Sequence, residues 1–331
     1  MDKNILFDTS CGSLNMGDYI ICESVERELK EILKDDFLIK LATHTPVTHF
    51  YQNMKGNPLF SYCQQAKYKF FAGTNILQYH LIFRLWPNFN ANIFNCKPYK
   101  NTILVGAGSA KNRPNMDPYT KMLFKKVLSK EHIHSARDES TKELIESLGF
   151  RAINTGCATM WCLTKEHCSQ IPEGKGENVL FTITDYKTDP QKDKEMIQCL
   201  LDNYAKVFCW IQGADDYDYL KTIMDLDKIT IIGSSLDQYR QFLMETDSLD
   251  YVGTRLHAGL FAMQKKKRSI ILSVDNRTED MKETYNLVVV DRADLSGLDS
   301  LINSSFSTNI NIKEENIREW KSQFKAPAGK R

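Results

Sequence analysis

The stretch Asp250–Gln264, DYVGTRLHAGLFAMQ, joins the end of an apolar strand to an apolar helix through the turn Gly253–Thr254. Arg255 and His257 stand where that helix is predicted to begin. The first backbone N–H groups of a helix have no partner within the helix and favour anions. A fixed cation and a titratable imidazole two residues apart are therefore suited to holding an anion and moving a proton. The alternative is a structural histidine beside an ordinary ion pair, and the stretch alone leaves both open.

Strand–helix pairs of the same kind occur along most of the chain. In the first half, strands are predicted at Asn4–Phe7, Tyr68–Ala72, Asn101–Val105, His132–Ala136 and Arg151–Asn154, and helices at Ile20–Leu33, Tyr119–Ser129 and Thr141–Leu148. In the second half, strands are predicted at Val179–Thr184, Lys206–Gln212, Ile229–Gly233, Ser269–Val274 and Leu287–Asp291, and helices at Lys192–Tyr204, Asp216–Asp225, Leu236–Thr246, Leu256–Gln264 and Glu279–Tyr285. Apolar strands that alternate with amphipathic helices are typical of parallel sheets covered on both faces. The sequence therefore predicts an α/β fold.

The chain has 331 residues, which is enough for two ordinary domains. The polar stretch Lys165–Glu177, with one proline and two glycines, is the predicted linker. We therefore expect Rossmann-like domains at 1–165 and 178–305 that face a cleft. The last segment, 306–331, contains the predicted helix Lys313–Phe324, which we expect to return and brace the first domain.

The composition is that of a globular protein, with 42% hydrophobic and 26% charged residues. A net charge of +1 gives no general attraction to nucleic acid. No run approaches the roughly 18 apolar residues that a membrane span needs, and the opening MDKNILFDTS does not resemble a signal peptide. We therefore expect a cytoplasmic location.

The nine cysteines form no CxxC pair. Cys157, Cys162 and Cys168 lie close together with His167, which leaves a metal site open, but reduced and buried thiols are the favoured interpretation. We therefore expect neither a metal nor a cofactor.

Small polar loops follow several predicted strands of the first half. The loop DTSCGSLNMGD follows the first strand, and Gly73–Asn75 and Gly106–Ser109 follow two others. Arg137 falls at the end of a further strand, just before a helix. The carboxyl ends of strands are where open α/β sheets bind ligands. The alternative is that these are ordinary tight turns.

Two further stretches each permit two interpretations. The aromatic region Tyr79–Tyr99, which includes Phe83 and Trp86, is favoured as core, with a sugar-binding surface as the alternative. The run Lys265–Arg268 is favoured as a basic helix end that complements the helix dipole. The alternative for this run is attraction to a lipid-linked phosphate or a membrane surface.

With these pieces in place, the sequence resembles the polysaccharide pyruvyl transferase family. No single motif is specific, but their order and spacing are, and GTRLHA is the strongest of them. The matching stretches are NMGD at 15–18, Gly73–Asn75, Gly106–Ser109, Ala136–Asp138, Thr155–Cys157 and GTRLHAGLFAM at 253–263, with the following loop Asp275–Arg277. The stretch from about residue 40 to residue 101 departs most from the family.

The resemblance implies a GT-B-like fold, with two Rossmann-type domains and the active site between them. It implies transfer of a pyruvyl group from phosphoenolpyruvate, as co-substrate, to two hydroxyls of one sugar. The products are a cyclic ketal and phosphate. The acceptor is expected to be a cell-surface glycan precursor, such as that of a capsule or exopolysaccharide. A lipid-linked acceptor would place the enzyme in peripheral contact with the inner face of the membrane.

The resemblance also implies roles for single residues. Arg137 and Arg255 match the family's arginines at the donor, and a guanidinium suits both its carboxylate and its phosphate. His257 matches the family's general acid. Donor- or substrate-binding positions carried over from the family are Asn15, Gly17, Asp18, Gly73, Thr74, Asn75, Gly106, Gly108, Ser109, Leu256 and Ser273. Asp18 has the alternative role of a residue that begins a helix.

Two other functions remain open at this point. A GT-B glycosyltransferase that uses a nucleotide sugar fits the same fold, since fold does not fix function. A catalytically silent member that acts as an assembly subunit is the other, although it would have no need of both Arg255 and His257.

Overall fold

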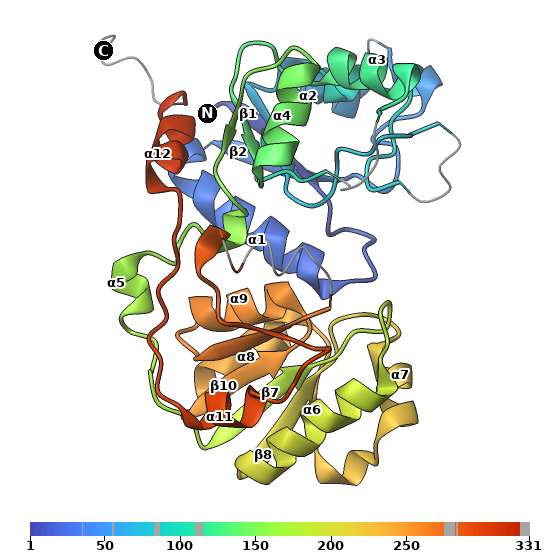
Figure 1. Ribbon diagram of the computed structural model, residues 1–331. Helices are drawn as coiled ribbons and strands as arrows, with labels where there is room; N and C mark the ends of the chain where they lie inside the picture. Colours follow the sequence, from blue (N-terminus) through green and yellow to red (C-terminus); the bar gives the residue numbers. More distant parts are fainter. Residues whose placement is uncertain are drawn as a thin grey trace. The chain divides into compact units, whose positions relative to one another are not determined.

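The computed structural model describes residues 1–34, 36–54, 56–82, 87–109, 115–274, 282 and 284–324 (Figure 1). The chain forms two compact units. The first unit contains Met1–Ser13, Ile21–Trp161 and the segment from Lys313 on, and the second contains Leu14–Ile20 and Cys162–Ile312. The division near residue 161 lies close to the expected linker. The expected first domain, however, had included Leu14–Ile20, which the structure places in the second unit.

The first unit is built on parallel strands. Its strands are β1 (Lys3–Asp8), β2 (Phe37–Ala42), β3 (Tyr68–Ala72), β4 (Thr102–Val105), β5 (His134–Ala136) and β6 (Ala152–Asn154). The first four form a sheet in the order β2-β1-β3-β4, and β5 pairs with β6. A parallel bridge between Ala107 and Ala136 connects the two groups. The order changes direction between β1 and β3, so the loops after these two strands lie where a ligand crevice is expected.

Capping residues fix where the helices of the first unit begin. Its helices are α1 (Met16–Leu33, whose first residues belong to the second unit), α2 (Pro58–Gln65), α3 (Pro118–Val127), α4 (Glu139–Ser147) and α12 (Glu314–Ser322), with the short 3₁₀ turns η1 (Phe50–Gln52), η2 (Lys97–Tyr99) and η3 (Ala158–Met160). Asn57, Asp117 and Asp138 each accept a hydrogen bond from a backbone N–H of the helix that follows. These caps satisfy N–H groups that would otherwise lack partners.

The C-terminal helix α12 packs on the first unit. Trp320 is fully buried, and with Ile317 and Phe324 it joins the apolar cluster around Leu6 and Phe70. The Trp320 indole also donates a hydrogen bond to the carbonyl of Ile133 at 2.8 Å. Helix α12 thus completes the core of the first unit, although it is far along the chain from the other elements of that unit.

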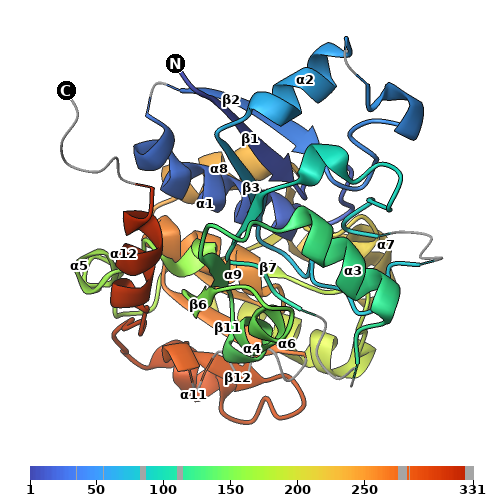
Figure 2. The ribbon, with the colours of Figure 1, turned by 90° about the horizontal axis from the view of Figure 1, so that it is seen from above.

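The second unit has one six-stranded parallel sheet, part of which is visible in Figure 2. Its strands are β7 (Asn178–Thr182), β8 (Lys206–Trp210), β9 (Thr230–Ile232), β10 (Leu249–Gly253), β11 (Ser269–Ser273) and β12 (Val289–Asp291), and its helices include α5 (Lys165–Cys168), α6 (Pro190–Asn203), α7 (Asp216–Ile223), η4 (Leu226–Lys228), α8 (Leu236–Glu245), α9 (Leu256–Gln264) and α11 (Leu298–Asn303). The order β9-β8-β7-β10-β11-β12 is the Rossmann order 3-2-1-4-5-6. The predicted α/β class with parallel sheets is confirmed.

Besides the short 3₁₀ turns, the sequence pattern missed four elements. β2, α2, α5 and α11 were not predicted, α5 because its residues fall in the expected linker, and α1 begins at Met16, four residues before the predicted start. β2 escaped because it is a partly exposed edge strand without a buried apolar run. Phe83, Trp86, the loop Asp275–Arg277 and most of the predicted helix Glu279–Tyr285 lie outside the described residues. In the described part of the aromatic region, Phe89 and Tyr99 are core residues, whereas Phe94 is exposed.

The run Lys265–Arg268 is not a continuous charged surface. Lys267 is half-buried and donates to the carbonyl of Thr246 at 2.7 Å. Arg268 is 1% exposed and pairs with Asp250 at 2.7 Å. The run therefore ends a helix and anchors it, which supports the structural interpretation.

Within the described residues, the helices are too short or too polar to cross a membrane. Among the same residues, no group of three or more His, Cys, Asp or Glu side chains is placed to hold a metal ion.

Candidate active site

The strand order of the second unit places Arg255 and His257 at the point where the sheet changes direction. β7 and β10 are neighbours there, and the chain leaves them in opposite senses. The crevice beyond the carboxyl ends of such strands is the usual ligand site of open α/β sheets. Gly253 is required at this position, because a Cβ atom would lie 2.6 Å from Thr182 Oγ1. Arg255 follows as the residue before α9.

Arg255 is held firmly from one side. Its side chain is 4% exposed, and Nε donates to the Ile183 carbonyl at 3.0 Å and to Asp216 Oδ2 at 3.2 Å. Nη2 donates to Asp216 Oδ1 and, at 2.7 Å, to Asp185 Oδ1. None of the described residues accepts a hydrogen bond from Nη1. The guanidinium is therefore oriented by carboxylates, and only its Nη1 edge remains for a ligand.

The two carboxylates differ in their surroundings. Asp216 is fully buried, and burial raises its pKa, which the charge of Arg255 opposes. Asp185 is 27% exposed. Burial opposes ionisation of Asp185 as well, but its hydrogen bond with Asp216 and the charge of Arg255 hold its pKa below the ordinary value. Asp216 thus serves as the fixed partner of Arg255, and Asp185 as the more accessible one.

His257 occupies the second position of α9, and Leu256 the first. Both side chains are partly exposed. The backbone beneath them is fixed, because the Tyr251 hydroxyl donates to the Arg255 carbonyl at 2.8 Å. Ser273 ends β11, the neighbour of β10, and is buried. These residues therefore share one edge of the sheet.

The NMGD segment joins the same edge. The Met16 N–H donates to the Gln212 carbonyl at 2.9 Å, and Asn15 forms a bridge to Gly213. Asn15 Oδ1 also accepts from Gln212 Nε2 at 2.8 Å and from the Gly17 N–H at 2.9 Å. Asp18 lies partly exposed in the first turn of α1. The NMGD segment is thereby placed beside the loop that carries Asp216.

Two buried polar atoms near Arg255 have no hydrogen-bond partner among the described residues. They are Gln212 Oε1 and Thr184 Oγ1, on residues that are 4% and 0% exposed. Buried polar atoms are nearly always satisfied by protein, water or a ligand. Their presence beside the bound guanidinium marks this edge as polar and suited to a ligand.

The first unit holds a second cluster, centred on Arg137. Nη2 of this arginine donates to Asn75 Oδ1 at 2.7 Å. The guanidinium lies directly against Gly108, where any Cβ atom would collide with it. Although burial would raise the pKa of Asp138, the hydrogen bond from Thr141 and the charge of Arg137 hold that pKa below its usual range.

The other predicted residues of the first unit surround Arg137. Gly73, Thr74 and Gly106 have positive φ angles of 37°, 55° and 58°. Gly108 N–H donates to the Thr74 carbonyl at 2.8 Å, and Ser109 N–H to Thr141 Oγ1 at 3.1 Å. Thr74 is 5% exposed, and its hydroxyl has no partner among the described residues. The structure thus brings all the predicted residues of this unit together at the carboxyl ends of β3, β4 and β5.

Comparison with known proteins identifies the family. The profile described as polysaccharide pyruvyl transferase matches residues 15–276, which is more than half of the chain. The chain belongs to the polysaccharide pyruvyl transferase family. The match spans both clusters, from Asn15 to the strand that ends at Ser273.

Solved structures resemble this pyruvyl transferase family member at low sequence identity. The E. coli heptosyltransferase WaaC, solved with ADP-2-deoxy-2-fluoro heptose, is 9% identical, with a TM-score of 0.40 over 82% of this chain and 88% of that one. The UDP-GlcNAc 2-epimerase from Neisseria meningitidis, bound to UDP-GlcNAc, is 12% identical, with a TM-score of 0.45 over 98% of each chain. A search of curated proteins finds no match.

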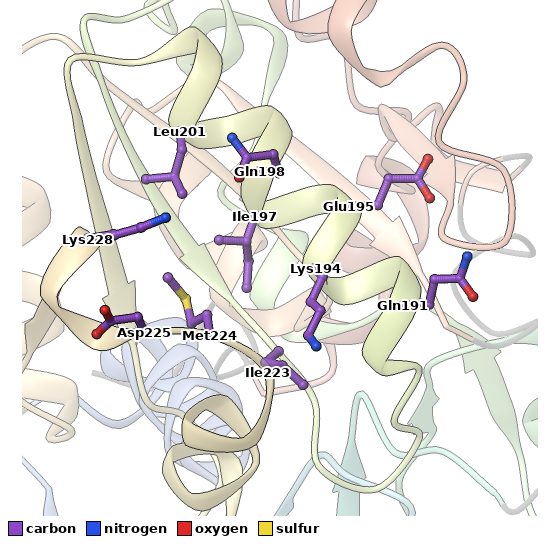
Figure 3. A pocket seen from close by; sticks show the side chains of 10 residues that line it. All are labelled: Gln191, Lys194, Glu195, Ile197, Gln198, Leu201, Ile223, Met224, Asp225 and Lys228. Carbon is purple, nitrogen blue, oxygen red and sulfur yellow. The ribbon is translucent and has the colours of Figure 1, made fainter.

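A surface depression of about 630 Å³ lies elsewhere in this family member (Figure 3). It is lined by the outer face of α6 and by residues around η4, such as Met224 and Lys228. The depression extends along α6 from Gln191 to Leu201. Its lining contains none of the family-matching residues, so we do not assign it to the active site.

The sequence pattern did not indicate four residues of the Arg255 site, namely Asp185, Gln212, Gly213 and Asp216. Asp185 follows the predicted strand Val179–Thr184 directly, so an acid at a strand's carboxyl end was the available signal. Asp216 was predicted only as the start of a helix.

Gly213 offers a sharp test of the Arg255 arrangement. A Cβ atom there would collide with Arg255 Nη2 and would lie 3.1 Å from both Asp216 oxygens. In Gly213→Ala the guanidinium must therefore move, and we expect kcat/KM of the transferase to fall about 10²-fold, as misplacement of a positioned group by about 1 Å does. Gly297→Ala, where a Cβ atom meets nothing within 4 Å, is the matched control. Equal activity of both variants would show that turnover does not depend on the position of the Arg255 guanidinium.

Proposed function

We propose that this family member transfers a pyruvyl group from phosphoenolpyruvate to two hydroxyls of a sugar in a cell-surface glycan precursor. The observation that carries the proposal is the convergence of NMGD and GTRLHA, far apart in sequence, on one sheet edge around Arg255. Family membership supports a transferase with a glycan acceptor. The donor, the ketal product and a capsule or exopolysaccharide precursor as the acceptor are parts of the proposal.

Arg255 is proposed to bind the donor through Nη1. Its other donor atoms are already bonded, so it presents a single oriented edge instead of a freely rotating fork. The N–H groups at the start of α9 add a second favourable interaction with an anion. Arg137, held by Asn75 over Gly108, is the second proposed donor arginine.

His257 is proposed as the general acid. It protonates the methylene carbon of phosphoenolpyruvate, so that this carbon becomes the methyl group of the product. One sugar hydroxyl adds to the central carbon, the bond from that carbon to the phosphate oxygen breaks, and a second hydroxyl closes the ketal. Of the two hydroxyl protons, one replaces the proton donated by His257 and the other leaves with phosphate, so the reaction needs no oxidant or cofactor.

Calorimetric titration of phosphoenolpyruvate tests donor binding at Arg255. Arg255→Lys keeps a cation beside buried Asp216 but loses the second arm of the fork, so we expect at least about tenfold weaker binding. Asp185→Asn removes a competing negative charge and is expected to bind about three- to tenfold more tightly. Unchanged affinity in both variants would place the donor elsewhere.

The same titrations address the glycosyltransferase alternative. UDP and GDP serve as comparators, with phosphate release in the presence of a sugar acceptor as the second readout. Binding of a nucleotide without any binding or turnover of phosphoenolpyruvate would replace the proposal by a nucleotide-sugar transferase. A cytoplasmic location and a lipid-linked acceptor are further parts of the proposal.

A further inference from the structure

One segment of the first unit has an unusual charge composition. Residues 37–116 contain no aspartate or glutamate, although the whole chain has 42 acidic residues among 331. The same segment contains nine cations: Lys40, Lys55, Lys67, Lys69, Arg84, Lys97, Lys100, Lys111 and Arg113. The chain carries a net charge of +1, so the remainder of the chain is net negative. In the described part of the segment, Lys40 and Lys67 form ion pairs with Glu26 and Asp2, and Lys69 is buried. Lys97 and Lys100 are therefore the exposed cations of this part that are left to favour an anionic partner.

The same segment exposes a cluster of large apolar side chains. Phe50, Tyr51, Met54 and Phe94 are 69%, 60%, 62% and 68% exposed. We call these four residues the apolar patch. Ile93, at 39% exposed, borders it. Large apolar side chains that are exposed close together mark interaction sites more often than singly exposed ones do.

The apolar patch is preformed. Asn53 Nδ2 donates to the Phe94 carbonyl at 3.1 Å, and Asn53 Oδ1 accepts from Thr48 Oγ1 at 2.6 Å, so the two loops are joined. The Tyr51 ring contacts that of Phe50 edge-on, with centroids 5.6 Å apart. These bonds hold the exposed rings in place without burying them. The turn η1 lies between β2 and α2 in the chain.

Cations lie next to the patch. Lys97 and Lys100 are exposed at the two ends of η2, and neither forms an ion pair with a carboxylate among the described residues. The buried Lys69 donates to the carbonyls of Pro98 at 3.2 Å and Lys100 at 2.8 Å, which fixes this turn. Only two residues separate Phe94 from Lys97 in the sequence, so apolar and cationic groups occur close together in this part of the chain.

We propose that the apolar patch and its neighbouring lysines dock this protein on an anionic lipid bilayer. Aromatic and methionine side chains suit the boundary between headgroups and acyl chains, and lysines suit lipid phosphates. Phe50 and Phe94 can stack on bases or sugar rings, but the aliphatic side chains of Met54 and Ile93 beside them cannot, so the combination favours a membrane over either polyanion. This surface replaces the run Lys265–Arg268 as the membrane contact, and it does not depend on the proposed donor chemistry.

Co-sedimentation of the full chain with vesicles tests the proposal. We expect at least about tenfold stronger binding to vesicles of phosphatidylcholine with 30% phosphatidylglycerol than to phosphatidylcholine alone, and weaker binding as salt rises. The double variant Phe50→Ser and Phe94→Ser should bind anionic vesicles about tenfold or more weakly than the wild type does. The double variant Lys97→Glu and Lys100→Glu should show a loss of the same size. Met244→Ser, which changes a side chain 66% exposed on α8 of the second unit, is the matched control and should bind as the wild type does.

A second readout does not rely on loss of binding. The tryptophan introduced in the Phe94→Trp variant should shift its fluorescence emission to the blue when anionic vesicles are added, because the ring enters an apolar environment. Absence of wild-type binding to anionic vesicles, or equal binding by the patch variants, would overturn the proposal. Binding of a single-stranded oligonucleotide without vesicle binding would also overturn it and would assign the surface to nucleic acid.

Discussion

Replacement of His257 by alanine is expected to lower phosphate release from phosphoenolpyruvate by about 10²- to 10⁴-fold, the usual contribution of a general acid. His257 is partly exposed at the start of α9, beside a guanidinium fixed by Asp216. The alanine variant removes the proton source without disturbing Arg255, so donor affinity should change much less than turnover. Rapid-mixing measurement of phosphate release, with titration of the donor, separates the two effects.

The matched control for His257 is a histidine of α5 that contacts the other end of α9. His167 contacts the Met263 carbonyl through Nε2 at 2.9 Å, near the end of α9. His167→Gln is expected to retain turnover, because this contact is structural. Turnover of His257→Ala within about threefold of the wild type would remove His257 from the reaction, whatever the donor affinity.

Replacement of Arg268 by alanine is expected to lower the free energy of unfolding by about 3–5 kcal/mol, the cost of breaking a buried ion pair from one side. Arg268 bonds to Asp250 and to the carbonyls of Leu301, Ile302 and Ser304. Without the guanidinium, Asp250 would be a buried carboxylate without its cation. Urea denaturation at pH 7 measures the loss.

The pH dependence of the Arg268→Ala variant gives an independent check. Burial raises the pKa of Asp250, and the charge of Arg268 opposes that rise, so in the variant the folded-state pKa must rise further. The unfolded carboxyl titrates near about 3.9, so between that pH and the folded-state pKa the folded state binds more protons. The variant should therefore regain stability as the pH falls toward about 4. Lys266→Ala, at an exposed position two residues away, should change stability by less than about 0.5 kcal/mol at any pH. Equal stability of the two variants would show that the ion pair does not hold this part of the fold.

The run Lys265–Arg268 shows what a sequence pattern can predict and what it cannot. Lys265, Lys266, Lys267 and Arg268 are alike in sequence, and their position after an apolar helix was enough to predict a helix end. Only the packing distinguishes them, because Arg268 alone enters the core, where Asp250 and three carbonyls receive it. The sequence alone was equally consistent with a membrane contact. The burial of the Arg268 side chain excludes that role for this residue.

The α/β alternation, the approximate strand positions and the placement of Arg137, Arg255 and His257 at strand ends were available from sequence, because apolar periodicity and glycine turns are local signals. The sequence did not indicate that Asn15 and Gly17 belong to the second unit. This membership rests on their pairing with Gln212 and Gly213, nearly 200 residues away along the chain, and no local pattern encodes such a pairing.

The sequence by itself determined the fold class and which side chains stand at the ends of strands. Only the tertiary structure decided what surrounds them. Strand order is fixed by side-chain packing across the whole sheet, and it is the adjacency of β8, β7 and β10 that brings Asp216 and Asp185 to Arg255. For this reason Arg255, which the sequence presents as a free cation, is oriented by two carboxylates and has a single edge left for a ligand.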